Sequence, residues 1–237
     1  EVICALETAV VKVDVGNLRR AAEVIRAGGL VAFPTETVYG LGANALDASA
    51  VGRIFEAKGR PSANPVIVHV SDASEVLNVA RTWPETAQKL AARFWPGPLT
   101  LVVPKSAAIP DIVTAGGPTV AVRCPNHPVA IALIREAGVP IAAPSANRST
   151  ELSPTRAEHV LKSLNGRIDL LLDGGACSGG IESTVVDVTG EIPRVLRPGL
   201  ISALQLEAVC GRVETGAKGE GAARSPGQMA KHYSPRT

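Results

Sequence analysis

Two short groups of polar residues in this sequence have side chains suited to binding phosphate. Lys58 and Arg60 flank a glycine, Asn64 follows shortly afterwards, and Ser145 and Asn147 come just after a proline. Lysine offers a phosphate a point charge and arginine offers it a planar fork. Cations at the end of a helix also suit the helix dipole, and that alternative stays open. These residue types favour positioning and charge stabilisation, which phosphoryl and nucleotidyl transfer mainly require.

A third group follows a short apolar run. The stretch 33–42 reads FPTETVYGLG and places two threonines, a glutamate and a tyrosine after that run. Open α/β sheets bind ligands in polar loops at strand ends, although a tight surface turn is the alternative. Arg123 ends another strand, and a buried arginine needs an anion from the protein or from a ligand. His69 shares a strand face with Ile67, and a lone histidine there is more often structural.

Several common active-site signatures are missing from the sequence. It contains no P-loop motif, and Gly40-Leu41-Gly42 does not complete the dinucleotide fingerprint. No Cys/His cluster has zinc spacing, so no metal bound by the protein alone is predicted. Ser145 lies in Ala-Pro-Ser-Ala-Asn rather than Gly-x-Ser-x-Gly, which disfavours a catalytic serine of the hydrolase type. With Asn147 it could instead hold a sugar or a phosphate, or cap a turn.

Composition describes a chain of 237 residues with a sizeable apolar core. Hydrophobic residues make up 46% and aromatic residues 3%, so small aliphatic side chains must build that core. The net charge of +2 and the lack of a basic run do not favour a nucleic-acid binder. The four widely spaced cysteines predict reduced thiols with packing roles in a cytoplasmic protein. No apolar run is long enough to span a membrane, and no signal peptide is evident.

The positions of helices and strands predict an α/β fold. Helices are expected over 17–27, from Asp47 or Ser49 to Lys58, from a capping box at Thr82–Glu85 to Phe94, and over 128–137, 155–164 and 202–209. Strands are expected over 30–33, 65–70, 99–103, 119–123, 139–143, 169–172, 184–188 and 194–196. Several successive strands lack a helix between them, which predicts a twisted, mixed parallel and antiparallel sheet flanked by helices.

The ordered set of motifs resembles the YrdC-domain family, and within it the threonylcarbamoyl-AMP synthases. The resemblance covers about 17–209 and rests on PTETVYGL, KGRP at 58–61, the run from Asn64 to His69, VAVR at 120–123, APSAN at 143–147, ESTV at 182–185 and LRPG at 196–199. Each motif is weak alone, but the set in this order is specific. Thr150 stands where the family commonly has glycine, and Cys124 stands where it commonly has an apolar residue.

The resemblance implies a YrdC-like fold with a concave basic cleft, and an enzyme activity. L-threonine, bicarbonate and ATP would give threonylcarbamoyl-AMP and pyrophosphate, with Mg²⁺ bound through the ATP phosphates. A separate transferase complex would then modify an adenosine next to the tRNA anticodon. The implied partners are these substrates, that complex and, weakly, RNA, with no membrane contact.

Residue roles are implied position by position. The resemblance implies that Lys58, Arg60, Ser145 and Asn147 are catalytic. It implies that threonine is bound by Thr37, His69, Arg123, Ala143 and Ser183. It implies that ATP is bound by Arg60, Asn64, Thr119, Ser145, Ser153, Arg197 and Tyr233.

The C-terminal stretch resembles the linker of longer, two-domain members of the family. We therefore expect a catalytic domain over 1–210 and a linker over 211–237, whose Tyr233 closes over the nucleotide before a further domain that this chain lacks. Gly211 to Ala223 is rich in Gly and Ala, as linkers often are. Two alternatives stay open: an RNA-binding module of the same family without adenylate chemistry, and a carbamoyl-transfer module that uses carbamoyl phosphate.

Overall fold

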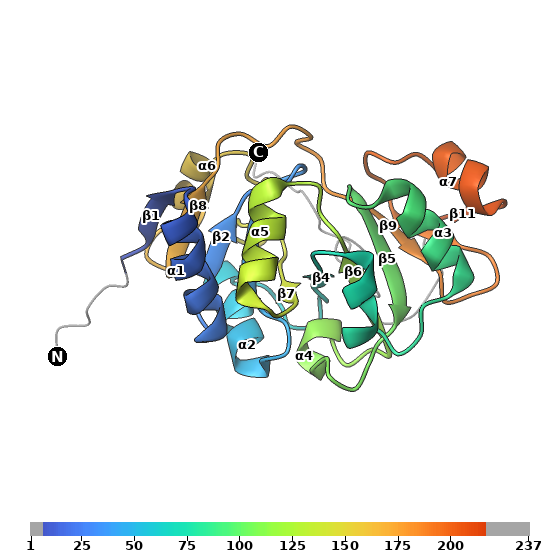
Figure 1. The fold of residues 1–237 in the computed structure, drawn as a ribbon, viewed down its shortest axis with the longest axis horizontal. Helices are drawn as coiled ribbons and strands as arrows, with labels where there is room; N and C mark the ends of the chain where they lie inside the picture. Colours follow the sequence, from blue (N-terminus) through green and yellow to red (C-terminus); the bar gives the residue numbers. More distant parts are fainter. Residues whose placement is uncertain (1–6, 217–237) are drawn as a thin grey trace.

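Eleven strands form one sheet in the computed structural model, which describes residues 7–216 (Figure 1). Their order across the sheet is β1-β8-β2-β3-β7-β4-β6-β5-β9-β10-β11. The strands are β1 (Ala9–Lys12), β2 (Val31–Phe33), β3 (Gly40–Asn44), β4 (Ile67–His69), β5 (Leu99–Pro104), β6 (Thr119–Arg123), β7 (Ile141–Ala142), β8 (Leu170–Asp173), β9 (Thr184–Asp187), β10 (Arg194–Arg197) and β11 (Glu214–Thr215). β4–β6 and β5–β9 are parallel, whereas β2–β3 and β5–β6 are antiparallel. The predicted mixed sheet is confirmed.

Helices cover both faces of this sheet. They are α1 (Val15–Arg26), α2 (Ala48–Lys58), α3 (Glu85–Phe94), α4 (Asp111–Thr114), α5 (Pro128–Ala137), α6 (Ala157–Leu164) and α7 (Ala203–Cys210), with a 3₁₀ helix over Ala73–Asn78. Asp47 caps α2 as predicted, by accepting hydrogen bonds from the backbone N–H groups of Ser49 and Ala50. The predicted capping box at Thr82–Glu85 is wrong: Pro84 is the N-cap of α3 and no side chain caps it. Ser202 and Gln205 form a capping box on α7 instead.

Two apolar cores lie on opposite faces of the sheet. In the segment around β2, Leu30 and Ala32 join the core that contains side chains of α2, α3, α6 and α7, while Val31 and Phe33 join the core formed with α1 and α5. This division follows from the alternation of side chains along a strand. Figure 1 shows α1 and α5 side by side over the end of the sheet that holds β1, β8 and β2. Helices α1 and α5 therefore cover only part of their face.

The rest of that face carries polar side chains above a small apolar cluster. Ile67, Val102, Ala121 and Val185 form the cluster on β4, β5, β6 and β9. His69 pairs with Arg123 across β4 and β6, and with Ile141 across β4 and β7, so these three residues share the face covered elsewhere by α1 and α5. The predicted sharing of one face by Ile67 and His69 is confirmed. The face left open by the helices is therefore where a ligand could reach the sheet.

The glycine-rich end of the stretch 33–42 is a strand rather than a loop. β3 begins at Gly40 and pairs with β2, so the loop between the two strands is limited to 34–39. A Cβ atom at Gly42 would lie 2.7 Å from Phe33 Cε1 and 2.8 Å from Ile141 Cγ2. Only glycine fits at that distance, so Gly42 permits close packing between strands. Sequence reasoning missed β3 because glycine is otherwise unfavourable in strands.

The cysteines of the described part are not joined in disulfides. Cys124, Cys177 and Cys210 are free thiols, Cys124 is buried, and burial raises the pKa of the Cys124 thiol to about 11.

Within the predicted linker, β11 pairs with β10; residues 217–237, including Tyr233, lie outside the described part. The division into a catalytic domain and a linker stays a prediction. Over residues 7–216, no helix has the length and apolar character needed to cross a bilayer.

Candidate active site

The loop 34–39 is held rigidly by the hydroxyl of Thr35. Thr35 Oγ1 donates to the carbonyl of Val38 at 2.6 Å and accepts from the backbone N–H groups of Thr37 and Val38, each at 3.2 Å. The hydroxyls of Thr35 and Thr37 lie 2.9 Å apart. Both threonines are buried, so these bonds form away from bulk water. The loop presents Thr37 to the pocket in a fixed orientation.

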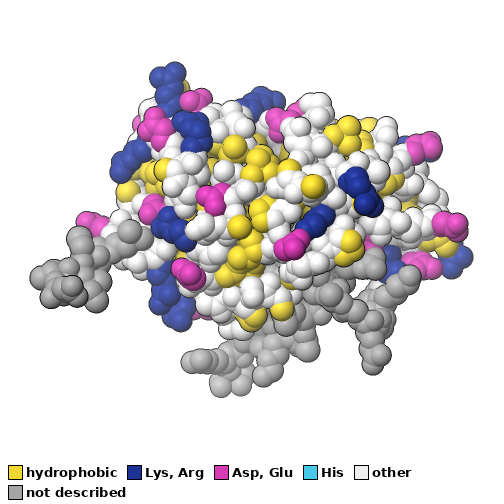
Figure 2. Space-filling view, turned by 90° about the horizontal axis from the view of Figure 1, so that it is seen from below, with side chains coloured by type: hydrophobic (Ala, Val, Ile, Leu, Met, Phe, Trp, Pro, Cys, Tyr) yellow, Lys and Arg dark blue, Asp and Glu magenta, His cyan; other side chains and the backbone are white. Residues whose placement is uncertain are grey.

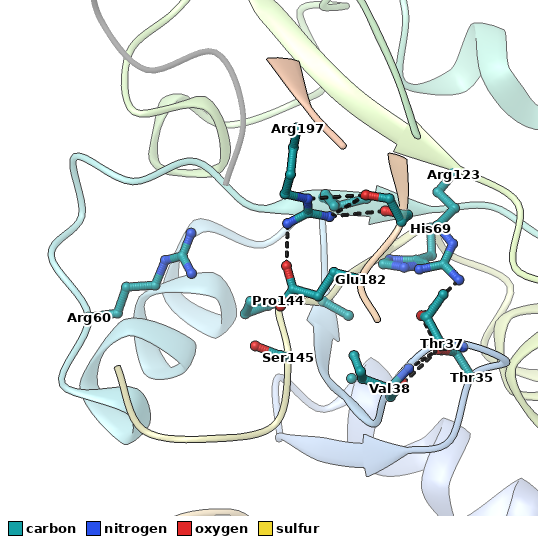
Figure 3. Close-up of a pocket in the computed structure, with 14 residues that line it drawn as sticks. Thr35, Thr37, Val38, Arg60, His69, Arg123, Pro144, Ser145, Glu182 and Arg197 are labelled. Atoms are coloured by element: carbon teal, nitrogen blue, oxygen red, sulfur yellow. Dashed lines mark hydrogen bonds and ion pairs between the residues drawn. The ribbon is translucent and has the colours of Figure 1, made fainter. Parts of the chain in front are cut away.

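Arg123 faces this loop from the end of β6. Its Nη2 atom donates to Glu36 Oε1 at 2.7 Å and to Thr37 Oγ1 at 3.1 Å. The anion that the sequence required for a buried arginine is thus present within the protein. His69 lies beside Arg123 (Figure 3); burial, and secondarily the charge of Arg123, lower the pKa of His69 to about 3. His69 is therefore a neutral imidazole at physiological pH.

A second arginine enters the same pocket from β10. Arg197 forms an ion pair with Glu182 and donates from Nε and Nη2 to the backbone carbonyl of Ser183, at 3.1 and 3.0 Å. Glu182 Oε1 also accepts from the hydroxyl of Ser153 at 2.9 Å. Ser183 Oγ lies 2.7 Å from Thr100 Oγ1. The loop before β9 is thus tied to β10, which fixes the orientation of the Arg197 guanidinium.

Arg60 approaches Glu182 and Arg197 from the segment that follows α2 (Figure 3). Its Nη2 atom donates to the carbonyl of Pro65 at 2.8 Å, and its Nε atom donates to the carbonyl of Asn64 at 3.3 Å. Burial lowers the pKa of Arg60 to about 10, so the guanidinium stays charged at neutral pH. Arg60 and Arg197 therefore bring two guanidinium groups to one half of the pocket, where Glu182 offsets one of the two charges.

The two motifs around Lys58 and Ser145 meet in space. Lys58 Nζ donates to the carbonyl of Ser145 at 2.5 Å and to the carbonyl of Asn147. The Asn147 side chain in turn donates to the carbonyls of Arg148 and Glu151, at 2.9 and 2.8 Å. Burial, and secondarily the charge of Arg60, lower the pKa of Lys58 to about 7. Lys58 thus fixes the loop that carries Ser145.

The pocket as a whole has two halves (Figure 3). Thr37, His69 and Arg123 line one half, whereas Arg60 and Arg197 line the other. Apolar lining is supplied by Val38, Ile67, Ala143 and Pro144. The first half combines an arginine with a neutral histidine and a hydroxyl, which suits a small carboxylic acid with a polar side chain. The second half suits phosphates.

The strongest external evidence comes from comparison with known proteins. The Sua5/YciO/YrdC family model, described as telomere recombination, matches residues 23–199. That match spans most of the chain. The chain belongs to this family.

Individual relatives in the Sua5/YciO/YrdC family support the assignment. The chain is 50% identical over 228 residues to the threonylcarbamoyl-AMP synthase of Pyrococcus abyssi, covering 94% of this chain and 67% of that protein. It is 52% identical over 223 residues to the threonylcarbamoyl-AMP synthase of Bacillus subtilis, covering 92% and 64%. A crystal structure of P. abyssi Sua5 complexed with L-threonine superimposes with a TM-score of 0.92 at 49% identity, covering 96% and 69%. The chain thus spans about two thirds of the length of these relatives.

The pocket unites most of the residues expected from the family resemblance. Eight of them line it: Thr37, Arg60, His69, Arg123, Ala143, Ser145, Ser183 and Arg197. Lys58 and Ser153 line a larger adjoining cavity, formed mainly by residues 148–155 and part of α6. Thr119 lies at the far end of β6 from Arg123, paired with Pro104. Asn64 and Asn147 are buried without lining either cavity.

Sequence reasoning assigned no role to two carboxylates of the site. Glu36 and Glu182 are the ion-pair partners of Arg123 and Arg197. Both stand inside motifs that carry the family resemblance, next to Thr37 and Ser183. The rule that a buried arginine needs an anion could have pointed to these two carboxylates, because Arg123 and Arg197 each have that anion within the protein.

Thr150 shows the structural cost of one departure from the family pattern. Its φ angle is 75°, in the left-handed region that glycine tolerates and a β-branched residue resists. It lies in the loop that follows Asn147 and lines the adjoining cavity. The glycine common at this position in the family would relieve that strain.

Proposed function

We propose that this chain joins L-threonine, bicarbonate and ATP into threonylcarbamoyl-AMP and pyrophosphate, for the modification of tRNA next to the anticodon. The observation that carries the proposal is the pocket with its two halves, one suited to an amino acid and one to phosphates, in direct contact. Two relatives of about 50% identity bear the name threonylcarbamoyl-AMP synthase, and the P. abyssi structure contains L-threonine. The catalytic roles of the residues below are part of this proposal.

The amino acid would bind with its carboxylate on Arg123 and its hydroxyl near Thr37 or His69. Because His69 is neutral, it can share a hydrogen bond with a hydroxyl without adding charge beside Arg123. The backbone of Ala143 and the hydroxyl of Ser183 complete this half of the pocket. Val38 and Ile67 offer apolar surface to the threonine methyl group. Burial of one methyl group discriminates against serine by roughly 1–3 kcal/mol.

The reaction would proceed in two steps. The threonine amine attacks the carbon of bicarbonate, and loss of water leaves a carbamate. A carbamate oxygen then attacks the α-phosphorus of ATP, and the bond from that phosphorus to the pyrophosphate oxygen breaks. Arg60, Arg197 and Lys58 would offset charge that develops on the phosphates, while Ser145 orients them. In this proposal these residues bind and orient the substrates and form no covalent bond with them.

Magnesium would arrive with ATP rather than be held by the protein alone. The described residues contain no cluster of three or more His, Cys, Asp or Glu side chains that could hold a metal. Glu182 is the single carboxylate among the pocket-lining residues, and Mg²⁺ is often held by one carboxylate together with substrate phosphates. The residues therefore fit the ion. Bound to ATP, Mg²⁺ would neutralise charge on the phosphate oxygens.

Release of pyrophosphate from ATP tests the proposal. The assay contains bicarbonate and is run without amino acid, with L-threonine and with L-serine. We expect release that depends on L-threonine and is weaker with L-serine.

Salt-dependent RNA binding without adenylate formation would favour the RNA-binding alternative instead. Figure 2 shows Lys/Arg and Asp/Glu side chains interspersed on the face it displays, which offers no uniform basic surface there.

The remaining assignments are separate proposals. The linker over 211–237 would act as a lid, with Tyr233 closing over the nucleotide to protect a labile intermediate. Full activity without product leakage after deletion of 211–237 would contradict the lid. The transferase complex that accepts the intermediate, weak RNA binding and a cytoplasmic location also stay predictions.

A further inference from the structure

One ion pair beside the amino-acid half of the pocket has no role in the chemistry proposed above. Glu36 lies against Arg123, and the exposed fractions of the two side chains are 12% and 5%. Glu36 Oε2 is buried and has no hydrogen-bond partner, and neither has Arg123 Nε. Buried polar atoms without partners are uncommon in folded proteins and call for an explanation. Here an acceptor and a donor are left open on two neighbouring side chains.

We propose that Glu36 receives the α-ammonium group of the amino acid whose carboxylate binds Arg123, an inference that rests on the function proposed above. An ammonium group is a donor only, and a carboxylate is an acceptor only. Glu36 Oε2 and Arg123 therefore match the two charged ends of one α-amino acid. Sequence motifs gave Glu36 no such role, because its partner Arg123 comes from a distant strand.

The charge balance of the site supports this assignment. Arg123 and Glu36 together carry no net charge, and His69 beside them is neutral. A ligand with a carboxylate alone would leave one negative charge uncompensated in a buried site, which is costly. A zwitterion adds one charge of each sign and keeps the site neutral. The pair thus selects amino acids over carboxylic acids that lack the ammonium group.

The backbone around Glu36 is held in place beside Arg123. Its carbonyl accepts from the backbone N–H of Gly179 at 2.8 Å and from the Ser178 hydroxyl at 3.2 Å. The residues on either side are fixed by the Thr35 hydroxyl, as described for the loop 34–39. Glu36 cannot be displaced far without breaking this loop. Its carboxylate therefore lies against Arg123, which itself lines the pocket.

A comparison of two ligands, each measured with the wild type and with two variants of Glu36, tests the proposal. Ligand-detected NMR would measure the dissociation constants of L-threonine and of 3-hydroxybutyrate, which has hydrogen in place of the ammonium group. The wild-type chain should bind L-threonine about tenfold or more tightly than 3-hydroxybutyrate. Glu36→Gln should weaken L-threonine by a similar factor and leave 3-hydroxybutyrate unchanged or tighter. Glu36→Asp, which keeps the charge, should retain most of the preference.

The control and the contrary outcomes separate this proposal from simpler ones. Glu158→Gln makes the same chemical change at an exposed position of α6 and should leave both constants unchanged. Equal weakening of both ligands by Glu36→Gln would show that Glu36 only holds Arg123 in place, and equal tightening would show that it only competes for Arg123. Equal binding of both ligands by the wild type overturns the proposal even if Glu36→Gln does not fold. A wild type that binds no L-threonine contradicts the proposed function instead.

Discussion

The buried lysine of the site should make the stability of the fold depend on pH. Lys58 is 2% exposed, and burial together with the charge of Arg60 lowers its pKa from 10.5 to about 7. Above pH 7 the folded chain loses this proton, while the unfolded chain keeps it up to about pH 10.5. The unfolded state then binds more protons, so the free energy of unfolding rises with pH in this window. One pKa unit corresponds to about 1.4 kcal/mol, so the gain between pH 7 and 9 is about 2 kcal/mol.

Urea denaturation of the wild type and of Lys58→Met at pH 7, 8 and 9 measures this gain. The difference between the two proteins removes other titrating groups that both contain. It should shift by about 2 kcal/mol in favour of the wild type from pH 7 to pH 9. Lys89→Met removes a solvent-exposed lysine of α3 and controls for the loss of one lysine side chain. A difference that is flat or that falls with pH would refute the reasoning, because Lys58 would then not be desolvated in the fold.

Four further substitutions test other parts of the structure. Gly199→Ala would place a Cβ atom 2.4 Å from the backbone N of Thr184, so it should lower the free energy of unfolding by roughly 1–3 kcal/mol. Gly52→Ala lies in the open interior of α2 and should raise the free energy of unfolding by about 0.5–1 kcal/mol. Chemical denaturation of the two variants measures both changes. Arg123→Lys loses the fork and should weaken L-threonine binding about tenfold or more in a calorimetric titration, with ATP binding much less affected. Thr150→Gly should raise the melting temperature by relieving about 1 kcal/mol of backbone strain.

Much of the architecture could be predicted from local patterns. The helix over 128–137 was placed correctly because Pro128 can open a helix and Gly138 can close one. The strand of residues 119–123 was likewise predicted with its observed limits. β3 was missed because its glycines are explained only by the positions of Phe33 and Ile141. The capping box at Thr82 failed because Pro84 starts the helix later than the spacing suggests.

In the site too, local sequence patterns predict some features, whereas contacts between distant segments decide others. Ile67 and His69 could be placed on one face because the alternation of side chains along a strand is regular. The ion pairs of Arg123 with Glu36 and of Arg197 with Glu182 could not be predicted, since each joins a loop to a separate strand. Nor could the sequence show that Lys58 holds the carbonyls of Ser145 and Asn147, because residue types alone do not reveal backbone partners.

The order of strands in the sheet has a consequence for folding during synthesis on the ribosome. β1 and β2 both pair with β8, and the pocket is closed by Arg197 on β10. A nascent chain that has produced Thr37 thus lacks its pocket until far more sequence has emerged. At about 5–20 residues per second, this delay is on the order of ten seconds or more. During that time the edge of β2 that later pairs with β8 is open, so a holding chaperone could bind a surface that the finished molecule no longer displays.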